Sequence, residues 1–211
     1  LCGACIPDVI ARTARGTLLV GAGTGITDVD RSTDGGATWE LDVHDGGVNC
    51  FYAASAALDR DVFACGRNGP VLRSPDGAAG TWEALGLVEP TNNAMHALAL
   101  TEALAGPALP GPRLVAGVLG GIAYSDDGGR TWAKSSMWEN FRWNAEGGLG
   151  RHAVAGHPYG GVLYAGVRDH GYGWPTVYAS EDGGRTWALR SSGPDMTETR
   201  FQELTVVADE S

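Results

Sequence analysis

Residues 125–132 read Ser-Asp-Asp-Gly-Gly-Arg-Thr-Trp, and this octet predicts how the chain folds. An aspartate at such a position can accept hydrogen bonds from the backbone N–H groups of a tight turn. Glycines supply the positive φ angles that such turns need. Thr131 then returns the chain to an extended conformation, and Trp132 offers a large ring for burial. The octet therefore predicts a tight turn between two strands.

The same motif occurs four times, which indicates a repeat architecture. Its copies, which we name boxes 1 to 4, span 32–39, 74–82, 125–132 and 180–187. Box 2 is one residue longer than the others. The box acids resemble catalytic carboxylates, but their repetition in every copy favours a structural role. The predicted structural residues are Asp34, Trp39, Asp76, Trp82, Asp127, Trp132, Asp182 and Trp187.

The motif resembles the BNR or Asp-box repeat, whose signature is Ser-x-Asp-x-Gly-x-Thr-Trp. The resemblance implies a β-propeller like those of sialidases, xyloglucan-type endoglucanases, sortilin-like receptors and photosystem II assembly factors. It also places each box on the turn between the third and fourth strands of a blade. The fourth strands are then expected to begin at the box threonines, over 38–43, 81–85, 131–135 and 186–191.

Short β-branched or aromatic runs bounded by glycine predict the remaining strands, among them the first two strands of blade 3 over 95–101 and 113–118. We expect an all-β fold, a single propeller domain or propeller fragment over 1–211 built from four-stranded antiparallel blades. The blades are predicted at approximately 5–43, 48–86, 94–136 and 151–191, with an extra strand at 201–207 that would begin a fifth. Propellers usually have about four to eight blades. The four blades therefore form a small closed ring or part of a larger ring, and the resemblance favours the larger ring. The remainder of such a ring would lie on a second chain or on a part of the protein outside this sequence.

Composition excludes several classes of protein. Of the 211 residues, 43% are hydrophobic, which is enough for a packed core. The formal charge is -10 and no basic run is present, so nucleic acid is not an expected partner. No apolar run reaches the roughly 18 residues of a membrane span. The chain begins at Leu1 rather than Met, as in a processed protein or a piece of a longer one.

Two long loops carry the residues that we predict to bind a ligand. One joins blades 3 and 4 over 134–150, and the other lies between the second and third strands of blade 4, over 168–175. Strand alternation places both on one face, where propellers usually bind ligands. Aromatic rings stack on sugars, and aromatics and arginine also dominate protein interfaces; alternatively, these rings only pack the loops against the blades. The candidates are Trp138, Glu139, Arg142, Trp143, Arg168, Asp169, His170, Tyr172 and Trp174.

The resemblance raises two glycosidase hypotheses. A sialidase needs an Arg-Ile-Pro motif on its first inner strand, whereas this chain has Cys5-Ile6-Pro7, and a neutral thiol cannot bind a carboxylate as arginine does. An endoglucanase needs two carboxylates that flank the scissile bond, for which Glu139, Glu146 and Asp169 are candidates. No complete catalytic set is recognised. A non-catalytic module that binds a protein or glycan is therefore favoured, with a glycoside hydrolase as the alternative.

The four cysteines suggest candidate disulfides. Cys2 and Cys5 are close in sequence, and Cys50 and Cys65 fall on neighbouring antiparallel strands of blade 2. Disulfides 2–5 and 50–65 would suit an exported protein, which agrees with the resemblance, so we expect a secreted or periplasmic location. Free buried thiols and a zinc site formed by all four cysteines are the alternatives.

Polar residues also begin several predicted inner strands, near the axis of a propeller. Cys50, His96, His152 and Gln202 occupy matching places in successive blades. Histidine and cysteine could hold a metal there, but such residues more often line a channel through hydrogen bonds. We expect no metal and no cofactor.

Overall fold

A computed structural model of this chain describes twelve stretches of it. They are residues 9–13, 15–21, 28–45, 48–53, 61–66, 70–86, 95–101, 113–118, 121–137, 153–156, 162–168 and 175–192. Within these stretches every regular element is a β-strand, and the strands form four sheets of four antiparallel strands each. The predicted all-β fold of four-stranded antiparallel blades is therefore confirmed.

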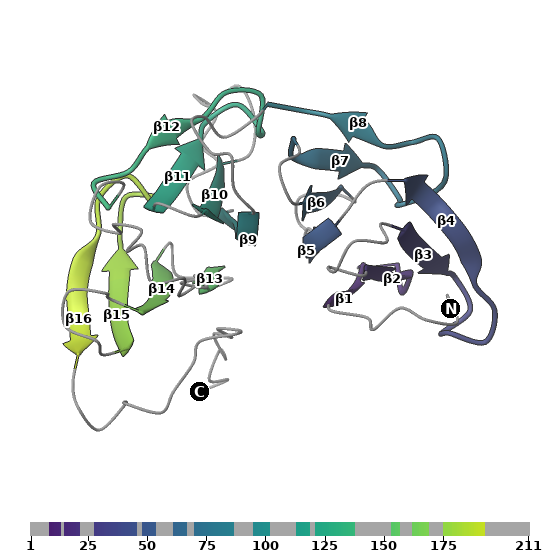
Figure 1. The fold of residues 1–211 in the computed structure, drawn as a ribbon, viewed down its shortest axis with the longest axis horizontal. Coiled ribbons are helices and arrows are strands. Elements are labelled where there is room, and N and C mark those ends of the chain that lie inside the picture. Colours follow the sequence, from purple (N-terminus) through teal and green to yellow (C-terminus); the bar gives the residue numbers. More distant parts are fainter. Residues whose placement is uncertain are drawn as a thin grey trace, which may run out of the picture. The chain divides into compact units, whose positions relative to one another are not determined.

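The chain divides into two compact units, and the first, Leu1–Leu87, holds two blades. Blade 1 consists of β1 (Val9–Arg12), β2 (Leu18–Gly21), β3 (Asp28–Ser32) and β4 (Glu40–Asp45). Blade 2 consists of β5 (Val48–Ala53), β6 (Val62–Gly66), β7 (Leu72–Ser74) and β8 (Glu83–Ala84). In each blade the strands are neighbours in chain order, and β1 contacts β5 of the next blade (Figure 1).

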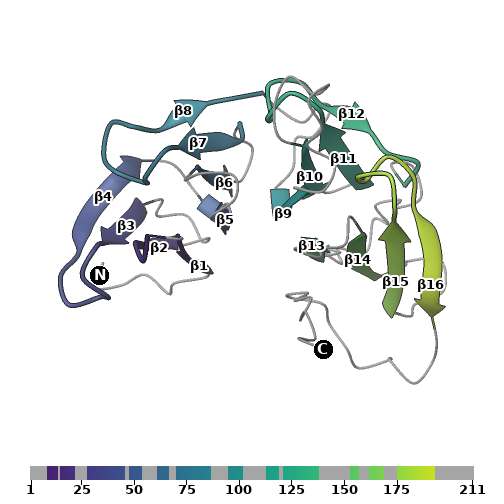
Figure 2. The ribbon, with the colours of Figure 1, turned by 180° about the vertical axis from the view of Figure 1, so that it is seen from behind.

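The second unit, Val88–Ser211, repeats this arrangement. Blade 3 consists of β9 (Met95–Thr101), β10 (Arg113–Val118), β11 (Gly121–Ser125) and β12 (Ala133–Lys134). Blade 4 consists of β13 (Ala153–Gly156), β14 (Leu163–Arg168), β15 (Pro175–Ser180) and β16 (Ala188–Ser192). Here β9 contacts β13, and Figure 2 shows blade 4 beside blade 3 from behind.

Each unit has a hydrophobic core that both of its blades share. In the first unit Leu19 and Val29 of blade 1 cluster with Val62, Ala64 and Leu72 of blade 2. In the second unit a cluster joins blade 3 to blade 4 in the same way, and its buried members are Val115, Ile122, Met137, Leu163 and Ala165. Removal of this apolar surface from water is the main force that holds neighbouring sheets face to face.

The fourth strand of every blade begins two residues later than the sequence analysis predicts. Strand β4 starts at Glu40 rather than Thr38, and β8, β12 and β16 start at Glu83, Ala133 and Ala188. In boxes 1, 3 and 4 the reason is local: the box threonine and tryptophan make hydrogen bonds back into the box, so they belong to the turn.

Two further sequence predictions concern the whole chain. The strand predicted at 201–207 lies outside the described residues. In the part of the chain that the structure describes, there is no helix of the length and hydropathy needed to cross a bilayer.

Candidate functional site

Box 3 is a turn closed by its own side chains. The Ser125 hydroxyl donates to Asp127 Oδ1 at 2.8 Å and accepts the Gly129 amide at 2.8 Å. The Asp127 carboxylate also accepts the Thr131 amide at 2.9 Å and the Thr131 hydroxyl at 2.7 Å. Trp132 Nε1 donates to the Gly129 carbonyl at 3.1 Å. Both carboxylate oxygens are thus engaged within the turn.

Boxes 1 and 4 repeat this network, whereas box 2 rearranges it. In box 1, Asp34 accepts the amide and hydroxyl of Thr38 at 2.9 and 2.6 Å, and Asp182 of box 4 accepts those of Thr186. Box 2 has an extra residue, and there the Thr81 amide donates to the Ala78 carbonyl instead. The Thr81 hydroxyl still donates to Asp76 Oδ1, at 3.2 Å.

These hydrogen bonds lower the pKa of the acids in boxes 1, 3 and 4. The hydroxyl and amide of Thr38, together with Ser32, lower the pKa of Asp34 from 3.8 to about 2. Burial raises the pKa of Asp127 and Asp182, but hydrogen bonds from Thr131 and Thr186 outweigh it, so both pKa values are lowered. An acid that is ionised and saturated with donors at neutral pH has no proton to give, which is the opposite of what a general acid needs.

In each unit a box glycine also lies against a side chain of the preceding blade. A Cβ atom on Gly77 of box 2 would lie 2.7 Å from a methyl carbon of Leu19 in blade 1. A Cβ on Gly184 of box 4 would lie 2.6 Å from a methyl carbon of Val115 in blade 3. Leu19 and Val115 occupy equivalent positions on the second strands of their blades. In each blade the preceding residue, Leu18 or Leu114, is paired across the sheet with the serine of that blade's own box.

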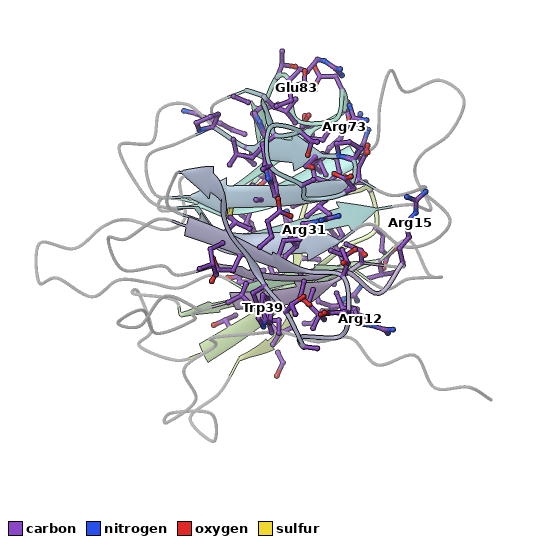
Figure 3. All side chains as sticks on the ribbon, turned by 90° about the vertical axis from the view of Figure 1, so that its right-hand side faces the viewer. Arg12, Arg15, Arg31, Trp39, Arg73 and Glu83 are labelled. Atoms are coloured by element: carbon purple, nitrogen blue, oxygen red, sulfur yellow. The ribbon has the colours of Figure 1, made fainter. Side chains whose placement is uncertain are left out.

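An arginine of the preceding blade adds a polar contact at each of these junctions. Arg31 Nε donates to the Asp76 carbonyl at 3.3 Å, and the first unit can be followed from its side in Figure 3, where Arg31 is labelled. Arg113 Nη1 donates to the Asp182 carbonyl at 2.9 Å. Each arginine therefore hydrogen-bonds to a main-chain oxygen of the turn that docks against its blade.

The junction of blades 3 and 4 also holds a cluster of charges. The Arg113 side chain is only 3% exposed and forms an ion pair with Asp126. Arg185 Nη2 approaches the other oxygen of Asp126 to 2.7 Å, and this hydrogen bond raises the pKa of Arg185. Both guanidinium groups lie near the Tyr124 ring, at 6.0 and 5.6 Å from its centroid. One carboxylate is thus flanked by two arginines, an arrangement that stabilises the junction.

This cluster was not predicted from the sequence. Asp126 occupies the variable second position of box 3, and Arg185 occupies the variable sixth position of box 4. The sequence does carry a signal for this ion pair, because residues of opposite charge occupy variable positions of successive boxes. Such residues can meet, since repeated turns on neighbouring blades lie close together.

The structure describes the segments from which both candidate ligand-binding loops begin. At the start of the first loop, the Ser136 amide donates to the Arg185 carbonyl at 2.9 Å, and the Trp187 amide donates to Ser136 Oγ at 3.1 Å. Met137 follows and is 2% exposed. The second loop is closed at its base by the cross-strand pair Arg168 and Pro175.

The candidate ligand-binding side chains themselves are not placed. Arg168 ends β14, but nothing is described of its side chain. The remaining candidates lie outside the described residues, as does Glu146; they are Trp138, Glu139, Arg142, Trp143, Asp169, His170, Tyr172 and Trp174.

Of the four cysteines, two fall within described strands. Cys50 of β5 lies directly opposite Cys65 of β6 in the antiparallel ladder. Cys65 is buried and disulfide-bonded. Cys2 and Cys5 lie outside the described residues. Among the side chains that the structure describes, no group of three or more His, Cys, Asp or Glu could hold a metal ion. His96 lies on β9, while His152 and Gln202 fall outside the described residues.

Comparison with known proteins defines the class of fold. No protein-family model and no curated protein matches this chain. Three solved structures resemble it. One is the GH74 xyloglucanase from Xanthomonas campestris, at 19% identity over 87% of this chain and 38% of that chain, with a TM-score of 0.48. The second is the extracellular domain of a hybrid two component system from B. thetaiotaomicron, at 11% identity over 89% of this chain and 22% of that chain, with a TM-score of 0.58.

The third similar structure is YCF48 from Cyanidioschyzon merolae, at 15% identity over 90% of this chain and 58% of that chain, with a TM-score of 0.58. The chain therefore spans between 22% and 58% of the length of these three solved chains. The four antiparallel four-stranded sheets, together with the two similarities at a TM-score of 0.58, show that the chain has a β-propeller type of fold.

Proposed function

We propose that this chain is an Asp-box β-propeller module that binds a protein or a glycan and catalyses no reaction. Binding would use the two loops over 134–150 and 168–175, with their aromatic and charged side chains. The observation that carries the proposal is the position of Met137. It packs in the same buried cluster as Leu163 and Ala165 of β14, the strand that leads into the second loop.

This packing brings the bases of the two loops near each other. Arg168 follows Ala165 by three residues on an extended strand, which is roughly 10 Å of chain. A rigid joint between two blades would therefore support both loops, and binding residues on loops held by a rigid scaffold are a common arrangement. Three tryptophans, Trp138, Trp143 and Trp174, would then contribute to a single surface.

The geometry of the boxes also supports a non-catalytic function. We propose that their acids and tryptophans hold turns together, because each carboxylate receives several hydrogen bonds inside its own box. The acids left for chemistry are then those of the loops, above all Glu139, Glu146 and Asp169.

We also propose that the protein is exported. Cys65 is disulfide-bonded, and Cys50 is its direct neighbour across the strands, so we infer that these two cysteines form the bond. Residues directly opposite each other in an antiparallel pair have Cα atoms within the span of a disulfide. Such bonds persist in oxidising compartments outside the cytosol.

One experiment separates binding from hydrolysis. The purified chain is incubated with xyloglucan oligosaccharides and sialyl oligosaccharides, binding is measured by calorimetry, and products are measured by mass spectrometry. We expect no product, and we expect Trp143→Ala and Trp174→Ala to weaken any glycan binding at least tenfold without changing the thermal midpoint. Leu189→Ala, on an exposed outer strand, is the matched control.

Two other outcomes would redirect the proposal. Product formation that is lost in Glu139→Gln, Glu146→Gln or Asp169→Asn would mean that the chain is a glycoside hydrolase. Binding that survives both tryptophan substitutions would mean that the two loops are not the binding surface. If no glycan binds, the same two variants are tested against a protein ligand. We expect each of them to reduce its affinity at least tenfold as well.

A further inference from the structure

Each box contains an Asp-Gly dipeptide, the sequence at which aspartate rearranges most readily because glycine has no side chain to hinder the reaction. The backbone nitrogen of the glycine attacks the carboxyl carbon of the aspartate, a succinimide ring closes and water leaves. Water then reopens the ring to aspartate or to isoaspartate, in which the main chain runs through the side-chain methylene. The four dipeptides are Asp34-Gly35, Asp76-Gly77, Asp127-Gly128 and Asp182-Gly183.

In box 1 burial does not prevent this reaction. Asp34, Gly35 and Thr38 are all exposed, so water reaches the reacting groups. Both oxygens of the carboxylate are nevertheless engaged: Oδ2 accepts the Thr38 hydroxyl at 2.6 Å, and Oδ1 accepts the Thr38 amide at 2.9 Å and the Ser32 hydroxyl at 2.8 Å. The carboxylate of Asp34 cannot turn toward the Gly35 nitrogen without breaking these hydrogen bonds.

The same hydrogen bonds oppose the chemical step itself. Ring closure needs a protonated carboxyl group, because one of its oxygens has to leave as water. Donors to a carboxylate favour its ionised form, and the contacts with Thr38 and Ser32 lower the pKa of Asp34 to about 2. The orientation and the charge of this carboxylate therefore both disfavour ring closure.

The other boxes also engage a reacting group. In boxes 3 and 4 the amide and hydroxyl of Thr131 and of Thr186 donate to the aspartate in the same way as Thr38 does in box 1. In box 2 the nitrogen that would attack is engaged instead, because the Gly77 amide donates to Ser74 Oγ at 2.8 Å and Gly77 is buried. Three of the four boxes thus use their threonine to hold the carboxylate.

We propose that Asp34, Asp127 and Asp182 are latent isoaspartate sites, which the threonine of each box keeps unreactive by occupying the carboxylate. Without the threonine hydroxyl, the carboxylate takes up a proton from water, the glycine nitrogen attacks the carboxyl carbon and loses its own proton, and one carboxyl oxygen leaves as water. Rearrangement to isoaspartate then adds a methylene to the main chain of the turn, so the box cannot close again. The inference stands independently of the proposed ligand, because it concerns the boxes and not the loops.

Ageing of the unsubstituted protein gives the first test. The purified protein is kept at neutral pH for several weeks, in buffer and in concentrated urea, and isoaspartate at each position is quantified by peptide mapping with electron-transfer fragmentation. Asp45-Gly46 lies outside the boxes and, like Asp34-Gly35, is followed by a second glycine, so it calibrates the rate in urea. We expect Asp34 to match Asp45 in urea and to rearrange at least tenfold more slowly in buffer. Equal rates for Asp34 in buffer and in urea would overturn the proposal.

Thr38→Val then tests the hydroxyl itself, because valine keeps the shape of the side chain and the backbone amide donor. We expect the rate at Asp34 in buffer to rise at least fivefold in this variant and to stay at the unsubstituted value in Thr38→Ser. Thr33→Val is the matched control: Thr33 is an exposed threonine of the same box, and none of the described hydrogen bonds to Asp34 comes from it. This control should leave the rate at Asp34 unchanged.

Asp76 reports within the same molecule whether Thr38→Val has opened more than its own box, because box 2 belongs to the same unit as box 1. A faster rate at Asp34 with an unchanged rate at Asp76 would support the proposal. A matching rise at both positions would overturn it, since the threonine would then act through the fold of the unit and not on the carboxylate. An unchanged rate at Asp34 in Thr38→Val would also overturn it.

Discussion

Arg113 of blade 3 donates a hydrogen bond from Nη1 to the main-chain oxygen of Asp182 in blade 4, across 2.9 Å. Asp182 uses its carboxylate inside its own turn and its carbonyl toward the neighbouring blade. The same residue therefore shapes the turn and joins two sheets. This dual role explains how one repeated octet can organise both the blade and the stacking of blades.

Loss of the buried arginine should destabilise the second unit more than loss of its exposed neighbour. Arg113→Met keeps the volume of the side chain but removes its charge, leaving Asp126 and the Asp182 carbonyl with one donor fewer. We expect about 1–3 kcal/mol less free energy of unfolding, because Arg113 is buried and loses its contact with a charged carboxylate, although Asp126 itself is 31% exposed and keeps Arg185. Urea denaturation followed by tryptophan fluorescence measures the change.

The matched control for this prediction is Arg185→Met. Arg185 contacts the same carboxylate, but its side chain is 46% exposed. We expect a loss of about 0.5 kcal/mol, as for surface ion pairs. Equal losses in the two variants would show that burial of Arg113 does not matter.

Two glycines of box 2 should respond differently to an added methyl group. Gly77 and Gly80 have similar positive φ angles, +74 and +75, so Gly→Ala strains the backbone alike at both. Only at Gly77 does the new Cβ meet Leu19, at 2.7 Å. We expect Gly77→Ala to cost about 1–3 kcal/mol more than Gly80→Ala, the usual cost of overpacking.

A double variant identifies the cause of that difference. Leu19→Ala should partly rescue Gly77→Ala in a thermal or urea unfolding experiment, since it removes the atoms that clash. Strict additivity of the two substitutions would mean that the glycine is needed only for its backbone conformation.

The carboxylate of Asp127 should matter for stability rather than for chemistry. Asp127→Asn replaces an oxygen that accepts the Thr131 hydroxyl with an amide group that can only donate. We expect a loss of roughly 1–2 kcal/mol, the contribution of a hydrogen bond to a charged group. Circular dichroism during urea unfolding measures it, with Glu181→Gln on the exposed surface as control; an unchanged midpoint would contradict a turn-stabilising role.

Stability should depend on pH through Asp34. Its folded pKa of about 2 is below the unfolded value of 3.8, so its contribution is fully present above pH 4. That contribution should disappear as the pH falls from about 4 to about 2, when the carboxylate becomes protonated. Carboxyl NMR titration should place the Asp34 pKa near 2. Asp34→Asn should flatten the dependence of the unfolding midpoint in this window relative to the unsubstituted chain; identical profiles would contradict the prediction.

Reduction should weaken blade 2. The Cys50–Cys65 bond that we infer closes a loop of about 15 residues, for which the chain-entropy estimate is about 3 kcal/mol. Peptide mapping without reductant should recover the two cysteines in one linked species. The paired variant Cys50→Ala with Cys65→Ala should unfold at lower urea concentration, and recovery of both cysteines as free thiols from the native protein would disprove the bond.

Sequence reasoning predicted the strands well because their signals are local. For example, β9 and β10 have the predicted bounds 95–101 and 113–118, since each is a largely aliphatic run with turn residues on either side. The starts of the fourth strands were wrong for a physical reason. Thr131 has high strand propensity, yet its hydroxyl and amide bind Asp127 and hold it in the turn.

The turns follow from local sequence, because the hydrogen bonds that close the turn of box 3 all join residues within 125–132. The way in which the blades join depends instead on contacts between residues far apart in the chain. Arg31 and Asp76 are 45 residues apart, and Arg113 and Asp182 are 69 residues apart. No local pattern specifies which arginine binds which carbonyl, because the two groups meet only when neighbouring sheets stack on a shared apolar core. The geometry of that stacking determines the pairing.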